Sequence, residues 1–84
     1  MQDKSASEVF AENLAAVILD RGLTVQSVAD CVGVNRTFIS QIIHKHNSPT
    51  VKTVEKLSKA LHVPLTEMFN PNFDAAHWHV EHGA

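Results

Sequence analysis

Apolar residues recur at the three- to four-residue spacing of amphipathic helices along most of the chain. The first such segment follows Ser5 and Glu8, which have the spacing of a helix-capping box. Gly22, a residue suited to the left-handed backbone of a helix end, closes the same segment. The pattern predicts a first helix from about residue 6 to residue 21.

Three more residues that favour helix N-caps each precede another apolar repeat, and these are Thr24, Asn35 and Thr50. Gly33 stands at the end of the repeat that follows Thr24. The signals predict a second helix that Gly33 terminates, a third helix after Asn35, and a fourth that runs from Thr50 to near residue 62.

A short helix over residues 65–69 should follow, because Val63-Pro64 can open it and Asn70-Pro71-Asn72 can stop it. No alternating pattern of useful length occurs before residue 76. The predicted fold class is therefore all-α, with five helices and a short C-terminal extension that is compatible with a strand.

With 84 residues, the chain holds one domain with a modest core. Its single cysteine cannot form an internal disulfide and its first residues lack a signal-peptide segment, which favours the cytoplasm. The longest apolar run, residues 14–19, is too short to cross a bilayer, so no membrane partner is expected. Because no glycine-rich phosphate loop or nucleophile–base set is recognisable, we expect a binding protein without cofactors, not an enzyme.

The charges are unevenly distributed along the chain. A net charge of −2 argues against binding to nucleic acid. Between Val34 and Lys59, however, five Lys or Arg residues accompany one glutamate, a net charge of +4, whereas the rest of the chain carries −6. This asymmetry predicts one cationic face on an otherwise acidic domain.

The second and third predicted helices, joined by a short turn that contains Gly33, have the arrangement of a helix-turn-helix. Ala29 is small where two helices approach closely, and Ile39 is an apolar anchor. Together with neighbouring positions, these residues form a longer set: Gly22-Leu23-Thr24, Val28-Ala29, Val32-Gly33-Val34, Phe38-Ile39-Ser40, Pro49-Thr50-Val51 and residues 57–69.

In this set, over about residues 6–69, the sequence resembles the lambda-repressor-like, or Cro/XRE, helix-turn-helix family. The resemblance implies a five-helix domain that binds a palindromic operator in double-stranded DNA as a homodimer, often as a repressor. It also implies an organisation of an N-terminal arm over 1–5, a DNA-binding domain over 6–69 with the helix-turn-helix at about 24–45, and a C-terminal tail over 70–84.

Carried over residue by residue, the resemblance assigns base contacts to the third helix. Arg36 can pair with guanine, Gln41 with adenine, and the Thr37 methyl group with thymine, while Asn35, Ser40 and His44 lie at the edges. Phosphate contacts fall at the starts of the second and fourth helices and in the loop between the third and fourth. The residues concerned are Thr24, Gln26, Lys45, Asn47, Ser48, Thr50 and Lys52.

Several positions depart from the family pattern, and two of them concern predicted DNA contacts. The glutamine that commonly opens the second helix is Val25, so Gln26 must replace its phosphate contact. The glycine that often closes the third helix is Lys45, and we expect Asn47 to adopt the left-handed conformation in its place.

The tail carries two further hypotheses. If residues 77–81 are extended, His77, His79 and Glu81 share one face, and with His82 they have metal-chelating spacing, although we favour a solvated tail without metal. Trp78 and Val80 would occupy the other face, which favours dimerisation through the tail and the fifth helix. The candidate interface residues are Leu65, Met68, Phe69, Phe73, Trp78 and Val80.

The sequence therefore predicts a transcriptional regulator, with two alternatives. One is an antitoxin or restriction-modification controller that regulates its own operon and holds a partner protein, for which exposed Val9, Leu19 or Val25 would be the feature to inspect. The other is a protein-interaction module that has lost DNA binding, which the acidic total charge would allow.

Overall fold

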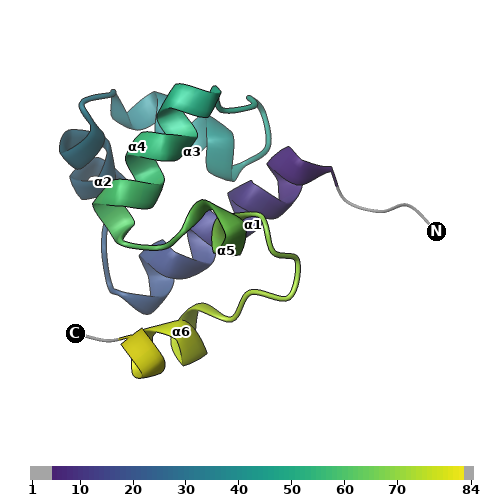
Figure 1. The fold of residues 1–84 in the computed structure, drawn as a ribbon. Helices are drawn as coiled ribbons and strands as arrows, with labels where there is room; N and C mark the ends of the chain where they lie inside the picture. Colours follow the sequence, from purple (N-terminus) through teal and green to yellow (C-terminus); the bar gives the residue numbers. More distant parts are fainter. Residues whose placement is uncertain (1–4, 83–84) are drawn as a thin grey trace.

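The computed structural model describes residues 5–82, which form helices joined by short connections. The helices are α1 (Ala6–Asp20), α2 (Val25–Val32), α3 (Arg36–Ile43), α4 (Val51–Leu61), α5 (Leu65–Met68) and α6 (Ala75–His82) (Figure 1). The predicted all-α class and the five predicted helices are confirmed, and α6 is a helix that the sequence analysis did not predict. None of the helices in this part of the chain has the length and apolar character needed to span a membrane.

Local capping explains where the helices begin. The Ser5 hydroxyl accepts a hydrogen bond from the Glu8 amide at 3.3 Å, and the Glu8 carboxylate accepts one from the Ser5 amide at 3.0 Å. Asn35 Oδ1 accepts the Phe38 amide at 2.9 Å at the start of α3, and Thr24 and Thr50 cap α2 and α4 in the same way. These bonds satisfy amides that have no partner within the helix.

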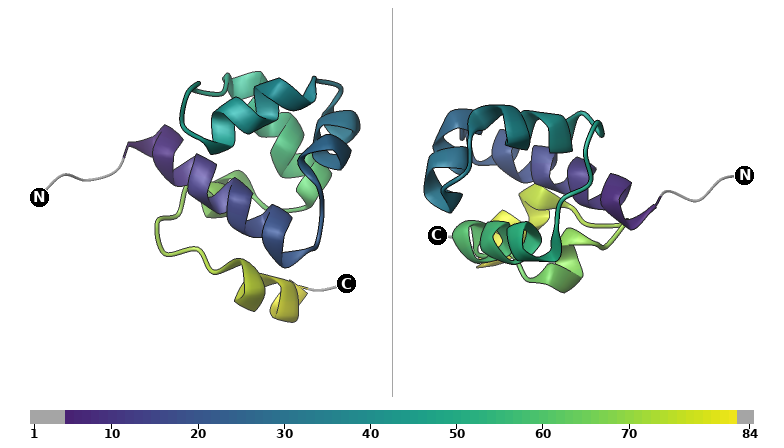
Figure 2. Two further views of the ribbon diagram at one scale, coloured as in Figure 1. Left: turned by 180° about the vertical axis from the view of Figure 1, so that it is seen from behind. Right: turned by 90° about the horizontal axis from the view of Figure 1, so that it is seen from above.

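The core lies where α1 crosses the other helices. Phe10, Leu14, Ile39, Ile42 and Leu57 have no exposed surface, and they come from α1, α3 and α4. In both views of Figure 2, α1 lies between α3 on one side and α6 on the other, and its contacts agree with this placement. The α2–α3 unit and α6 are therefore attached to opposite sides of α1.

The strand considered for residues 77–81 is wrong, because these residues lie within α6. Asp74 starts the helix, since its carboxylate accepts the His77 amide at 3.1 Å and its carbonyl accepts the Trp78 amide at 2.9 Å. Helical geometry separates the two apolar side chains of this segment. Trp78 packs against the core beside Phe73, with ring centroids 6.3 Å apart, whereas Val80 is 84% exposed.

The loop after α3 also differs from expectation. Lys45, not Asn47, adopts the left-handed conformation, with φ 64°. The amides of His46 and Asn47 then turn back to donate to the Gln41 carbonyl at 2.8 and 3.3 Å. Lys45 thus occupies the conformation that glycine would adopt most easily, and the loop is tied to the end of α3.

Candidate nucleic-acid interface

The pairing of α2 and α3 is that of a helix-turn-helix. Ala29 of α2 and Ile39 of α3 are completely buried, which allows the two helices to approach closely. Gly33 ends α2 with φ 73°, and the next amide, that of Val34, donates to the Ala29 carbonyl at 3.1 Å. The turn is therefore fixed by backbone geometry, and it holds α3 across the outer side of the domain.

One side of α3 carries all the residues predicted to contact bases. Arg36, Thr37 and Gln41 are exposed, as are Asn35 and His44, and Ser40 is half-buried. Helical spacing places Thr37, Gln41 and His44 opposite the buried Ile39 and Ile42. Arg36 and Ser40 lie toward the edge of the same side, and Asn35 precedes the helix as its N-cap. We call this surface, made of Asn35, Arg36, Thr37, Ser40, Gln41 and His44, the α3 polar face.

Several side chains of the α3 polar face are already held by the protein itself. Gln41 Oε1 accepts a hydrogen bond from Asn47 Nδ2 at 2.8 Å, and His44 Nδ1 lies 2.8 Å from the Ser40 carbonyl. Asn35 uses its carboxamide oxygen for the cap of α3. These contacts preorganise part of the surface and limit the orientations of Gln41 and His44.

The residues predicted to contact phosphate surround this face at the starts of α2 and α4 and in the α3–α4 loop. The exposed residues among them are Thr24, Gln26, Lys45, Asn47, Ser48, Thr50 and Lys52. Two of them have acidic partners within the chain. Gln26 Nε2 donates to Asp30 Oδ1 at 2.9 Å, and Lys45 Nζ lies 2.7 Å from Glu12 Oε2 of α1. Sequence reasoning missed the second contact because 33 residues separate its partners.

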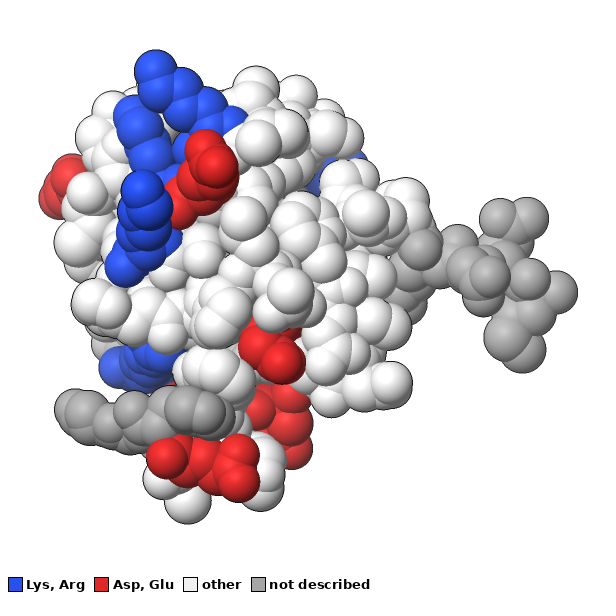
Figure 3. Space-filling model, in the orientation of Figure 1, with Lys and Arg blue, Asp and Glu red and all other residues white. Residues whose placement is uncertain are grey.

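The basic residues of α4 form an exposed stripe. Lys52, Lys56 and Lys59 follow the i, i+4, i+7 spacing of one helix side, and all three are exposed. Figure 3 shows Lys and Arg gathered on the side of the molecule formed by α4, and Asp and Glu near α5 and α6. Cys31 of α2 is exposed and lines an open depression beside Lys56 and Lys59.

The predicted dimer residues fall into two groups. Met68 has no exposed surface, and Phe73 and Trp78 pack against the core of their own chain. Leu65, Phe69 and Val80 are exposed by 39%, 36% and 84%, and the Phe69 ring lies 5.3 Å from that of Phe10. Only the second group offers substantial apolar surface to a partner.

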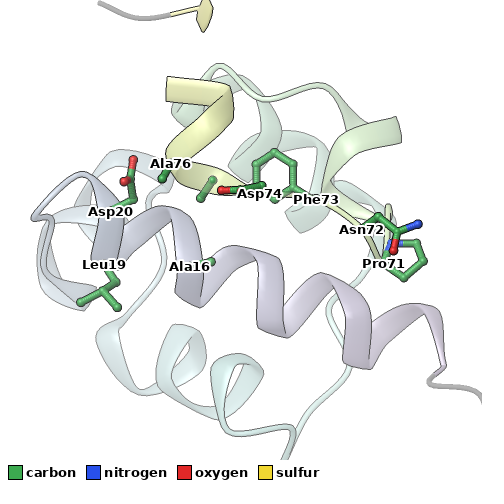
Figure 4. Close-up of a pocket in the computed structure, with 9 residues that line it drawn as sticks. Ala16, Leu19, Asp20, Pro71, Asn72, Phe73, Asp74 and Ala76 are labelled. Atoms are coloured by element: carbon green, nitrogen blue, oxygen red, sulfur yellow. The ribbon is translucent and has the colours of Figure 1, made fainter. Parts of the chain in front are cut away.

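A groove that the sequence analysis did not identify lies between α1 and the segment leading into α6 (Figure 4). It is open, has a volume of about 650 Å³, and is lined by Ala16, Leu19, Asp20 and residues 71–76. Leu19 is 83% exposed at its edge, although it is a large apolar side chain. Of the other residues considered for a protein partner, Val9 is buried and Val25 is half-buried.

The histidines of the tail form pairs with carboxylates. His77 Nε2 lies 3.4 Å from Glu81 Oε1 on the same helix, and His79 Nδ1 lies 3.1 Å from Asp20 Oδ2 of α1. Within the described part of the chain, no group of three or more His, Cys, Asp or Glu residues is placed to hold a metal ion. The side chain of His82 lies outside the described residues.

Comparison with solved structures supports the architecture. The crystal structure of the clp gene regulator ClgR from C. glutamicum matches with a TM-score of 0.72 and 15% identity, over 79% of this chain and 86% of that one. The hypothetical transcription factor NHTF from Neisseria matches with a TM-score of 0.77 and 22% identity, over 86% of this chain and 83% of that one. At these identities the similarity shows the fold.

Sequence comparison extends the similarity to a family. The HTH-type transcriptional regulator SutR of Escherichia coli (strain K12) is 33% identical over 51 residues, which cover 61% of this chain but 29% of the length of SutR. A helix-turn-helix family model of the Cro/C1 type matches residues 14–68, which include the whole α2–α3 unit. The chain therefore belongs to the Cro/C1-type helix-turn-helix family, as the sequence analysis predicted.

Proposed function

We propose that this protein is a cytoplasmic transcriptional repressor that binds a palindromic operator in double-stranded DNA as a homodimer. The observation that carries the proposal is the α3 polar face, which is held on the outer side of a helix-turn-helix. Membership of the helix-turn-helix family, the similarity to the transcriptional regulator SutR, and the basic residues of the third and fourth helices and their loop support DNA binding.

In the proposed complex, α3 lies in the major groove. Arg36 donates two hydrogen bonds to guanine, Gln41 pairs with adenine through its carboxamide, and the Thr37 methyl group contacts thymine. Gln41 Oε1 has two lone pairs, so it can accept from adenine while it keeps the hydrogen bond from Asn47, and Gln41 Nε2 can donate to the base. The amide-rich starts of α2 and α4 contact the backbone, with Thr50 and Lys52 at the second of these.

For the homodimer, we propose an interface formed by the exposed apolar side chains of α5 and α6. Leu65 and Val80 are the candidates of greatest exposure among the predicted interface residues, and Phe69 is next. To read two half-sites of one operator, the two copies of α3 in this dimer must lie about 34 Å apart, one turn of the duplex. The tail over 70–84 then acts as a dimerisation segment of the DNA-binding domain.

Selection of bound sequences from random duplex DNA tests the proposal. Wild-type protein should enrich a palindrome, and Arg36→Ala and Gln41→Ala should each relax the preference at symmetric positions. Lys56→Ala removes a positive charge from α4, outside the α3 polar face, and should weaken binding without changing the preference. Absence of any enriched sequence from the wild-type selection would contradict the proposed function.

The exposure of Leu19 favours a second candidate, a controller or antitoxin that regulates its own operon and holds a partner protein at the groove beside α1. The test compares binding to the protein's own promoter with and without the product of the adjacent gene. This candidate predicts that Leu19→Asp abolishes the effect of the added protein and leaves DNA binding alone unchanged. If Leu19→Asp abolished DNA binding as well as the effect of the added protein, or abolished neither, the result would contradict this candidate function.

A further inference from the structure

The ion pair between Lys45 and Glu12 connects the loop after α3 to the first helix. Lys45 Nζ lies 2.7 Å from Glu12 Oε2, and the two side chains are 40% and 37% exposed. The position of Lys45 is constrained, because its backbone is left-handed and its amide donates to the Ile42 carbonyl at 3.0 Å. The contact therefore joins α1 to a loop whose backbone is already fixed against the end of α3.

The surroundings of Lys45 are more acidic than the sequence suggested. The hydrogen bond with Glu12 raises the pKa of Lys45 above its ordinary value of 10.5, and the charges of Glu12 and Glu8 act in the same direction. The ammonium group therefore remains charged at neutral pH. A carboxylate that bonds it uses the same chemistry as a phosphate oxygen, namely an anionic oxygen that accepts from N–H.

Glu12 and a DNA phosphate would therefore compete for one cation. If Lys45 turned to a phosphate, it would give up a short charge-assisted hydrogen bond. If it contacted both groups, the carboxylate and the phosphate would be brought close together, and like charges repel. Either arrangement makes the Lys45–phosphate contact less favourable than for a lysine without an acidic neighbour.

We propose that Glu12 is a positioning residue that competes with the DNA backbone for Lys45 and thereby lowers the affinity of the protein for duplex DNA. The inference rests on the proposed function, together with the phosphate contact that the family resemblance assigns to Lys45 in the α3–α4 loop. It assigns a role in DNA binding to a side chain of α1, a helix outside the helix-turn-helix. It also revises the role of Lys45, which the sequence analysis assigned to a phosphate contact and which is bound by the Glu12 carboxylate in the free protein.

The first test replaces Glu12 by Gln, which keeps the size of the side chain and removes its charge. The dissociation constant for the selected operator should fall about 1.5- to 5-fold per subunit at about 0.1 M salt. Because Lys45 then neutralises a phosphate, the slope of log K against log salt should become steeper by about 0.9 per subunit. Asp20→Asn makes the same change of net charge at the end of α1, away from the predicted DNA contacts and outside the set of proposed dimer-interface residues, and it should leave the slope unchanged.

The second test shows whether the effect acts through Lys45. In protein that already carries Lys45→Gln, the further change Glu12→Gln should alter neither affinity nor salt slope. A gain that persists in this background would overturn the proposal, because Glu12 would then repel DNA by itself. Unchanged or weaker binding by Glu12→Gln, with an intact circular dichroism spectrum, would also overturn it.

Two controls separate the possible failures. Glu12→Ala removes the same charge with a different side chain. It should show the same gain in DNA affinity as Glu12→Gln, which excludes an effect specific to the introduced glutamine. If wild-type protein bound no duplex at all, the proposed function would fail, and this inference with it. If wild-type protein bound its operator and Glu12→Gln did not bind more tightly, the role of Glu12 alone would be refuted.

Discussion

Asn13 gives a sharp test of how the domain is held together. Its side chain is buried in α1, and Nδ2 donates to the carbonyls of Met68 and Asn70 at 2.9 Å and of Glu67 at 3.3 Å. These carbonyls lie at the end of α5, where a helix leaves its last acceptors without partners in the same helix. One side chain of α1 therefore caps the end of α5.

We expect Asn13→Ala to destabilise the protein by about 2–3 kcal/mol. Two N–H donors are lost, each with a net value of about 1 kcal/mol. The Glu67 and Asn70 carbonyls keep backbone donors, from Asn70 and Phe73. The Met68 carbonyl, in contrast, loses the donor that Asn13 supplied, which adds to the cost. For a domain of this size, the melting temperature should fall by roughly 10–20 °C. Circular dichroism during thermal and urea unfolding measures both quantities.

Asn72→Ala is the matched control, because it makes the same change on an exposed side chain and should cost less than about 0.5 kcal/mol. Asn13→Asp tests whether residue 13 must act as a hydrogen-bond donor, because a carboxylate cannot donate to the three carbonyls. The introduced carboxyl group should have a raised pKa in the folded protein. The loss of stability of this variant relative to wild type should therefore grow as the pH rises above about 3.9. A cost for Asn13→Ala that matches the control would refute the capping role of Asn13.

Three further predictions concern other elements. Hydrogen bonds from Ser5 lower the pKa of Glu8 below 4.5. The ionised Glu8 carboxylate therefore stabilises the fold above that value, and this stabilisation is lost as the pH falls through the lowered pKa. The difference in melting temperature between wild type and Glu8→Ala should narrow from about pH 6 to about pH 3. His62 ends α4 with φ 58° and is exposed, so His62→Gly should stabilise the protein by about 0.5–1 kcal/mol in urea unfolding, and a loss of stability would contradict this. Trp78→Ala should cost about 1–3 kcal/mol, because the side chain is partly buried between α6 and the core; a cost near zero would show that α6 does not depend on this contact.

The signals that allowed correct prediction were local. Asn35 and Thr50 each hydrogen-bond to an amide three residues later, and Gly33 needs only its own positive φ. Such features act within one turn of the chain, so a sequence displays them directly. The α3 polar face could be predicted for the same reason, because helical periodicity alone determines which residues are opposite Ile39.

The features that were missed depend on distant parts of the chain. The Glu12–Lys45 pair and the Asn13 cap join residues 33 or more positions apart, and no periodicity predicts them. In the tail, the alternation of Trp78 with Val80 indicated a strand, but Asp74 is a helix cap and Trp78 alone finds a place against the core. A local helix cap and tertiary packing together outweighed a weak alternating pattern there.

The position of Cys31 has a practical consequence for measuring the proposed dimer on DNA. It is the single cysteine of the chain, it is exposed, and it lies on the α2–α4 side of the domain rather than on the α3 polar face. A spin label or fluorophore that reacts with thiols would therefore mark each subunit at one defined point, without any engineered residue. Two labelled subunits on one duplex would provide a molecular ruler, from which the geometry of the complex could be obtained directly in solution.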